Sequence, residues 1–268
     1  MPELPDVEHF RRYIDRTSLK QKIEKVEIFN KKVLRGASIT SIGKTLKGKT
    51  FTATYRHGKY LFFKTDSTAS LVFHFGMTGY PVYEKSRTAG DETEKHRQLR
   101  FLVEFDNGGY LGFVNTRLLG RVDITKDIAQ YISDAGLGPD AASVDEQTFV
   151  RVIGSTKGML KSTFMNQGKI AGLGNIYVDE LLFQTGLHPR TKIDALTDEQ
   201  LRSLYKTMRR VIEQSLEADA DIEKLPDNYL IPHREPGSPC PRCSGSIEKK
   251  TIAGRSTYFC PDCQIEIT

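Results

Sequence analysis

Cys240-Pro-Arg-Cys243 and, after sixteen further residues, Cys260-Pro-Asp-Cys263 are the stretches that decide how the carboxyl end of this chain folds. Two C-x2-C pairs at this separation match the four-cysteine zinc template. Each pair makes a tight turn whose two sulfurs converge on one ion, and residues 244–259 suit a β-hairpin that brings the turns together. Four thiolates leave no open coordination position, so we expect one zinc ion with a structural role.

The alternative for these cysteines is a pair of disulfides. Disulfides persist mainly in secreted proteins, and the N-terminus lacks the apolar segment of a signal peptide. We therefore expect a reducing, cytoplasmic compartment. The chain has no run of about eighteen apolar residues, so we expect no membrane segment.

The charge of the chain is moderately positive. Its 268 residues include 39 Lys+Arg and 34 Asp+Glu, which gives a formal net charge of +5. This excess permits a polyanionic partner without establishing one. The length allows two domains and a small metal-bound appendage.

The chain opens Met1-Pro2-Glu3. Removal of Met1 is expected before a small residue, and Pro2 would then carry a secondary amine in place of an amide. Such amines add to aldehyde-like carbons and form Schiff bases, and the neighbouring Glu3 carboxylate could move the protons. The alternative is an ordinary frayed terminus. A helix over residues 6–16 would hold the end on a fixed platform, which favours the nucleophile.

Residues 22–120 contain short runs rich in β-branched and aromatic residues, separated by Gly and Asn turns. We predict strands at 23–28, 51–55, 60–63, 71–75 and 101–105. This pattern predicts a two-layer antiparallel β-sandwich over residues 1–135, with the first helix on its flank. The polar segment 84–98 is expected to be a loop.

The composition becomes loop-like at residues 136–140, where we place the start of a helical domain over 136–235. The predicted helices are 144–153 with Ser143 as N-cap, 159–166, 176–184, and a long helix capped by Thr197. Three glycines within residues 167–175 indicate two helices joined by two turns. Residues 236–268 form the zinc finger. The fold class is therefore α+β and multidomain.

The glycine-rich turns can also form an anion site, because free N–H groups at the start of a helix favour phosphate. Asn175 lies at the predicted N-cap, and Lys161 and Lys169 add positive charge. The alternative is that Asn175 only caps its helix. Spacing alone does not choose between the two.

Three separated segments resemble the formamidopyrimidine-DNA glycosylase/endonuclease VIII family, in the order that the family has them. They are Pro2-Glu-Leu-Pro-Asp-Val-Glu8, Gly172-Leu-Gly-Asn-Ile-Tyr177 and Gly254-Arg-Ser-Thr-Tyr-Phe-Cys-Pro-Asp-Cys-Gln264. The resemblance covers essentially the whole chain. It implies an N-terminal β-sandwich, a helix–two-turn–helix domain and a zinc finger.

The resemblance also implies roles for single residues. Pro2 resembles the nucleophile that attacks C1′ of the damaged nucleotide, and Glu3 resembles the acid that protonates the sugar ring oxygen. Lys59 matches the strand lysine that approaches the lesion and its phosphate. Asn175 and Arg255 match the asparagine and the hairpin arginine that bind phosphates.

The loop His74-Phe-Gly-Met77 resembles the loop whose methionine fills the gap left in the base stack. His74 itself is expected to contact phosphate or to pack. From the residues alone, Lys59 would be a solvated strand charge and Met77 a core residue.

Two features differ from relatives that process 8-oxoguanine. Arg117 matches their arginine, which can pair with the orphaned base, but Leu119 stands where they carry a wedge phenylalanine. Residues 219–239 are short where they carry a long glycine-rich loop over the lesion. We therefore expect 8-oxoguanine not to be the best substrate. Formamidopyrimidines, oxidised pyrimidines or further-oxidised guanines are the expected ones.

Together the resemblance implies a base-excision-repair DNA glycosylase with AP lyase (β/δ-elimination) activity on damaged double-stranded DNA. We expect a monomer, associated with the nucleoid, that needs no nucleotide cofactor. One alternative is a non-catalytic damaged-DNA-binding protein of the same fold. Another is a zinc-ribbon RNA-binding protein, which leaves Pro2 and Glu3 unexplained.

Overall fold

The computed structural model describes residues 1–36, 38–86 and 97–268. The chain forms two compact units: Met1–Pro2 with Asp6–Ala135, and Glu3–Pro5 with Gly136–Thr268. Most of the polar segment 84–98, expected to be a loop, lies outside the described residues.

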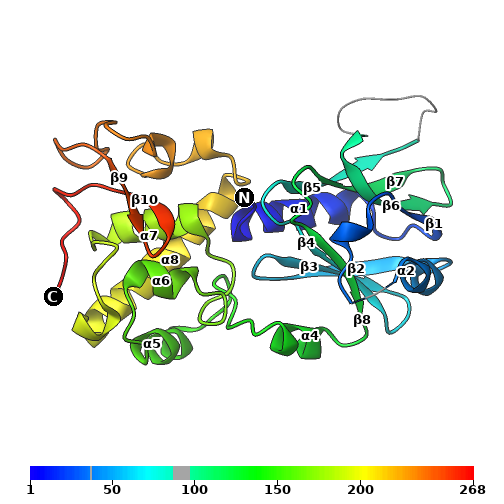
Figure 1. Ribbon diagram of the computed structural model, residues 1–268, viewed down its shortest axis with the longest axis horizontal. Helices are drawn as coiled ribbons and strands as arrows, with labels where there is room; N and C mark the ends of the chain where they lie inside the picture. Colours follow the sequence, from blue (N-terminus) through cyan, green and yellow to red (C-terminus); the bar gives the residue numbers. More distant parts are fainter. Residues whose placement is uncertain (37, 87–96) are drawn as a thin grey trace. The chain divides into compact units, whose positions relative to one another are not determined.

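The first unit is a sandwich of two four-stranded antiparallel sheets, with strand orders β1-β6-β7-β5 and β2-β3-β4-β8 (Figure 1). Rings from both sheets meet in one buried core: Phe73 of β4 packs edge to face on Phe101 of β6, with ring centroids 5.7 Å apart. The predicted β-sandwich is therefore confirmed. The strands are β1 (Ile23–Ile28), β2 (Phe51–His57), β3 (Tyr60–Thr65), β4 (Ser70–His74), β5 (Gly79–Glu84), β6 (Leu99–Phe105), β7 (Tyr110–Asn115) and β8 (Arg121–Thr125).

The sequence pattern missed β5, β7 and β8. Pro81 in β5 and Gly112 in β7 weaken a strand signal. Gly112 is required by packing, because a Cβ there would lie 2.5 Å from Leu99 Cδ1 and 2.9 Å from Val82 Cγ2. A glycine that reads as a turn signal therefore lies inside a central strand.

Helix α1 (Leu4–Thr17) is the predicted first helix, and its Val7 and Ile14 are fully buried in the sandwich core. Two further helices of this unit, α2 (Ile39–Leu46) and α4 (Ile128–Asp134), and the turn η1 (Lys31–Val33) were not predicted. Each helix is short, which leaves little periodic signal.

The second unit holds α5 (Glu146–Gly154), α6 (Leu160–Met165), α7 (Asn175–Thr185), α8 (Asp198–Glu217) and the turn η2 (Ile193–Ala195). Thr197 caps α8, as predicted, and it does so in a capping box with Gln200. The cap of α5 was predicted wrongly: it is Asp145, whose carboxylate accepts from Thr148 N at 2.8 Å, rather than Ser143. Between α6 and α7 the chain makes the expected turns, so the helix–two-turn–helix prediction is confirmed.

The cysteine segment forms a hairpin of β9 (Glu248–Ile252) and β10 (Arg255–Phe259). Its two-residue turn, Ala253 and Gly254, has φ values of 50° and 71°, as a type I′ turn requires. Two short turns, η3 (Ile222–Lys224) and η4 (Ile231–His233), precede the finger. Within the described residues, no helix is both long and apolar enough to cross a membrane.

Candidate functional site

Glu3 is fixed at the start of α7. Its side chain is 1% exposed, and its carboxylate accepts hydrogen bonds from Gly174 N at 2.7 Å, Ile176 N at 3.0 Å and Tyr177 N at 3.2 Å. Leu4 N also donates to Gly172 O at 3.0 Å. Residues 3 and 4 are therefore firmly held, which contradicts the frayed-terminus alternative for them.

The anion at the α7 N-terminus is thus a carboxylate of the chain itself. This corrects the expectation that free amides at this helix end wait for a phosphate. It also corrects the N-cap: Gly174 occupies that position, and Asn175 is the first residue of the helix without a capping bond. The hypothesis that Asn175 only caps its helix is wrong.

The Asn175 side chain contacts the zinc hairpin instead. Its Nδ2 donates to Ser256 O at 2.7 Å, next to Arg255, which is exposed at the start of β10. An amide nitrogen carries two hydrogens, so one donor of Asn175 remains for another acceptor. The structure thus brings Asn175 and Arg255 close together.

Lys161 is not on the surface. Its side chain is 0% exposed, and its Nζ lies 2.6 Å from Asp179 Oδ1 and 3.1 Å from Asn175 O. Burial lowers the pKa of Lys161, and the Asp179 carboxylate opposes that effect. This placement does not support the expectation that Lys161 contacts DNA, because its ammonium is buried and pairs with Asp179.

Lys59 and His74 lie together in the first unit. Lys59 precedes β3 and is 9% exposed, while His74 ends β4 with its ring 4.7 Å from Tyr60. Burial, then the nearby charges of Arg121 and Lys59, lower the pKa of His74 to about 4. Gly76 N donates to His74 Nδ1 at 3.3 Å, so the neutral ring keeps its proton on Nε2 and can donate it.

Arg121 was missed by reasoning from the sequence. It is exposed at the start of β8 and pairs across the sheet with His74. An arginine directly after Gly120 gave no signal alone, because the strand β8 was not recognised. Lys59, His74 and Arg121 form a cluster of donors.

Two loops at one end of the sandwich present exposed side chains. Met77 is 39% exposed and Leu119 is 50% exposed, so Met77 is not a core residue. Asn115, fully buried, joins the loops: its Nδ2 donates to Phe75 O at 3.0 Å, and its Oδ1 accepts from Gly120 N at 3.3 Å.

Arg117 is exposed in the second of these loops, and its N donates to Thr78 Oγ1 of the first at 3.3 Å. Leu118 between Arg117 and Leu119 has a φ of 54°, in the left-handed region that is uncommon for residues other than glycine. The structure thus places Met77, Arg117 and Leu119 on two loops that hydrogen bonds join; their role as a wedge stays a prediction.

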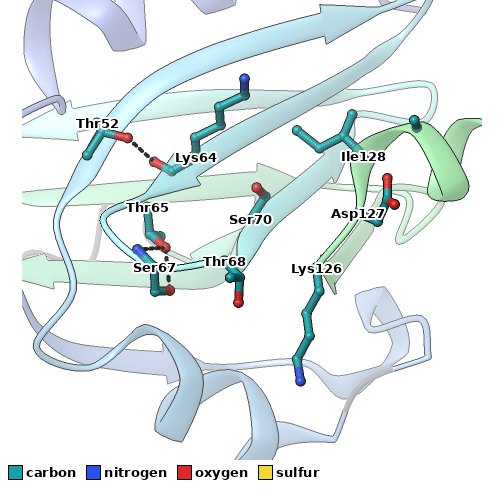
Figure 2. Close-up of a pocket in the computed structure, with 10 residues that line it drawn as sticks. Thr52, Lys64, Thr65, Ser67, Thr68, Ser70, Lys126, Asp127 and Ile128 are labelled. Carbon is teal, nitrogen blue, oxygen red and sulfur yellow. Dashed lines mark hydrogen bonds between the residues drawn. The ribbon is translucent and has the colours of Figure 1, made fainter.

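A hollow of about 410 Å³ on the sheet β2-β3-β4-β8, beside α4, is a separate feature. Figure 2 shows that its two lysines, Lys64 and Lys126, point away from one another. None of the candidate site residues lines this hollow.

The four cysteines meet in one cluster. All four Sγ atoms lie within 4.8 Å of one another, with Cys240–Cys263 at 3.8 Å and Cys243–Cys260 at 3.5 Å. A tetrahedron with zinc–sulfur bonds of about 2.3 Å has sulfur–sulfur edges of about 3.8 Å. None of these four forms a disulfide, so the geometry fits zinc.

Three family profiles match successive parts of the chain. The formamidopyrimidine-DNA glycosylase N-terminal domain matches residues 1–122, and the H2TH domain of the same enzymes matches residues 136–227. The zinc finger found in FPG and IleRS matches residues 237–265. With the cysteine geometry, this last match establishes one structural zinc ion.

Individual relatives agree over the full length. A formamidopyrimidine-DNA glycosylase of Desulfitobacterium hafniense is 32% identical, covering 99% of this chain and 100% of its own. The Arabidopsis thaliana protein of the same name is also 32% identical, over 98% of this chain and 71% of its own. A Lactococcus lactis formamidopyrimidine-DNA glycosylase, solved with AP-site DNA, has a TM-score of 0.88 and 27% identity, covering 98% and 100% of the two chains. The chain belongs to the formamidopyrimidine-DNA glycosylase family.

Proposed function

We propose that this protein removes oxidised bases from damaged double-stranded DNA and then cleaves the strand at the abasic site. Pro2 is the nucleophile and Glu3 moves the protons. Family membership supports the reaction class, and a relative from Lactococcus lactis has been solved with DNA containing FAPY-dG. The observation that carries the assignment is the Glu3 carboxylate held by three backbone amides, directly next to Pro2.

The first step needs the free amine of Pro2. Once Met1 is removed, the lone pair of the ring nitrogen attacks C1′, and the glycosidic bond breaks with its electrons leaving on the base. The nitrogen then loses its proton, and the sugar ring opens to an iminium as the ring oxygen gains one. A single group that accepts the first proton and donates it to the ring oxygen balances both transfers.

Glu3 suits this shuttle in its resting state. Three N–H donors and the positive end of α7 stabilise its ionised carboxylate. It therefore starts as a proton acceptor and becomes the acid only after Pro2 has given up its proton. This order explains how Glu3 can act as an acid although a helix N-terminus favours its ionised form.

Strand cleavage follows from the iminium. The positive nitrogen acidifies the hydrogen on C2′, and loss of that proton expels the 3′ phosphate. A second elimination expels the 5′ phosphate, so the product is a gap. Both steps use the same covalent bond to Pro2.

The remaining residues hold the DNA. Lys59, His74 and Arg121 offer donors to phosphate, which fixes register without reading sequence. A base must leave the duplex before C1′ can be attacked, and unstacking costs a few kcal/mol. Met77 and Leu119 are the exposed apolar side chains that can fill the gap and offset this cost.

We propose that 8-oxoguanine is not the preferred lesion. The segment after α8 is short and anchored at two residues: Tyr229 is 2% exposed and Leu230 is fully buried, while residues 222–224 are exposed. Its length and these anchors limit how far it can fold over a flipped base. We therefore expect formamidopyrimidines, oxidised pyrimidines or further-oxidised guanines to be excised faster, which a panel of lesion duplexes under single-turnover conditions measures.

The decisive test is covalent trapping. The Met1-processed protein is mixed with abasic-site duplex and borohydride, which reduces the iminium to a stable adduct. We expect the adduct to be much reduced in Pro2→Gly, because its terminal primary amine gives a neutral imine in place of the cationic iminium of proline, while Pro5→Gly, which keeps the terminal proline, retains the adduct. Strong binding without any adduct would favour a non-catalytic damaged-DNA-binding protein.

We also propose the division into a catalytic domain (1–135), a helical DNA-binding domain (136–235) and a zinc finger (236–268). The proposed enzyme acts as a monomer inside the cell. Light scattering of the protein with and without duplex tests the monomer.

A further inference from the structure

Asp179 is a fully buried carboxylate in α7 that binds three separate segments. Its Oδ1 lies 2.6 Å from Lys161 Nζ of α6. Its Oδ2 lies 2.6 Å from Arg234 Nη2, in the segment before the finger, and accepts from Tyr258 N of β10 at 3.2 Å. One side chain therefore joins the helical hairpin to the zinc hairpin.

The same groups contact the two phosphate-binding candidates of this unit. Lys161 Nζ donates to Asn175 O at 3.1 Å, and the Asn175 amide donates to Ser256 O at 2.7 Å. The guanidinium of Arg234 lies 4.5 Å from the centre of the Tyr258 ring. Asp179 therefore contacts β10, the strand that begins at Arg255, directly, and it contacts Asn175 through Lys161.

The arrangement is costly if stability is its purpose. Asp179 and Lys161 are fully buried and Arg234 is 16% exposed, whereas apolar residues of similar size often stabilise a core as well or better. Buried ionic groups are best attested as devices that fix one register among several. Asp179 fits that role, because its partners lie on three segments that no regular secondary structure joins.

We propose that Asp179 is a positioning residue for DNA binding: it sets the register of the zinc hairpin against the N-terminal turn of α7, so that Asn175 and Arg255 grip neighbouring phosphates. Asp179 is 0% exposed and does not touch DNA itself. The inference rests on the proposed function, since it requires that both residues bind the phosphates of damaged DNA.

The test is a double-mutant cycle read by DNA affinity. Asp179→Asn keeps the shape but removes the charge that pairs with Lys161 and Arg234. The dissociation constant for duplex containing a tetrahydrofuran abasic analogue should rise about tenfold to a hundredfold, the size of one or two charged hydrogen bonds. In an Arg255→Ala background, Asp179→Asn should raise the dissociation constant by less than about threefold, because the hairpin then lacks its phosphate-binding side chain.

Asp140→Asn is the matched control. Asp140 is also a buried carboxylate of this unit, and it accepts from Ala142 N at 2.9 Å, in the loop before α5. Loss of this carboxylate should act equally with and without Arg255. If Asp179→Asn behaves like this control, or leaves the affinity unchanged, the positioning role is wrong.

Two further measurements keep the outcome clear. Should Asp179→Asn fail to fold, Arg234→Gln removes one partner from the partly exposed side and should show the same dependence on Arg255. Borohydride trapping by the wild-type protein is run in parallel. No wild-type adduct and no affinity for the abasic duplex would refute the proposed function, whereas additive mutations in an active enzyme would refute only the role of Asp179.

Discussion

Replacing Gly174 with alanine should displace the Glu3 carboxylate from the backbone amides that bind it, while leaving the fold intact. Gly174 has a φ of −130°, which alanine adopts without strain. A Cβ at this position, however, would overlap Glu3 Cδ and Glu3 Oε1. The methyl group and the carboxylate cannot occupy the same space, so one of them must move.

The side chain should yield rather than the backbone. The Glu3 side chain has rotatable bonds that can turn its carboxylate away, whereas the backbone of Gly174 is fixed by the start of α7. Moving the carboxylate breaks three hydrogen bonds of 2.7, 3.2 and 3.0 Å. Each is worth about 1.5–3 kcal/mol, but water can replace the bonds of a displaced carboxylate. We expect the free energy of unfolding to fall by only ~1–2 kcal/mol.

Catalysis should suffer far more than stability. Loss of a positioned proton-transfer group costs about 100-fold to 10,000-fold, so the single-turnover excision rate should fall at least about 100-fold. The affinity for abasic-analogue duplex should change less than about threefold, since Gly174 contacts no phosphate in this proposal. Excision from a formamidopyrimidine duplex, with Glu3→Gln as reference, measures the first quantity, and titration measures the second.

Gly43→Ala is the control for adding a methyl group, because nothing lies within 4 Å of a Cβ built there in α2. It should leave excision unchanged. Excision at the wild-type rate by Gly174→Ala, with slow excision by Glu3→Gln, would show that the Glu3 carboxylate works without its hydrogen bonds to the backbone amides.

Three further predictions concern other parts of the molecule. Burial raises the pKa of Glu180 from 4.5 to about 7, so the folded protein binds this proton more tightly than the unfolded chain does. The resulting stability is full below pH 4.5 and lost as the pH rises through 7. The stability of Glu180→Gln relative to the wild type should therefore rise by up to ~3 kcal/mol between pH 4.5 and pH 8, as urea titrations at both pH values can show; a difference that does not change with pH would contradict the raised pKa. Leu119→Ala should lower the preference for lesion over intact duplex about fivefold, from ~1 kcal/mol of lost apolar contact, with an unchanged melting temperature; a large fall in melting temperature would mean that Leu119 is a core residue. Chelation of zinc should unfold the finger and abolish abasic-duplex binding, measured by anisotropy, and retained binding would contradict a structural metal.

Local signals were enough to predict most of the architecture. The cysteine spacing, the strand runs and the cap at Thr197 each depend on residues close in sequence, and the structure agrees with them. The errors arose where tertiary packing overrides a local signal. Gly112 lies in a central strand because Leu99 and Val82 leave no room for a side chain.

The roles of the charged residues were harder to predict, because the sequence does not show whether a charged side chain is buried or exposed. Lys161 looked like a phosphate ligand, but its ammonium is buried against Asp179, eighteen residues away in the chain. Arg121 looked ordinary, yet strand pairing places it opposite His74. Both errors come from partners that only the folded chain brings together.

The glycines before α7 are explained by the N-terminus rather than by turn geometry alone. Gly172, with a φ of 115°, would need a Cβ 2.6 Å from Leu4 Cδ1, and Gly174 would need one inside the Glu3 carboxylate. The two glycines of Gly172-Leu-Gly-Asn175 therefore make room for residues 3 and 4. A motif that resembles a phosphate loop therefore binds, in this chain, the residues next to the proposed nucleophile Pro2. Its glycines and residues 3 and 4 must be changed together if the site is to be redesigned.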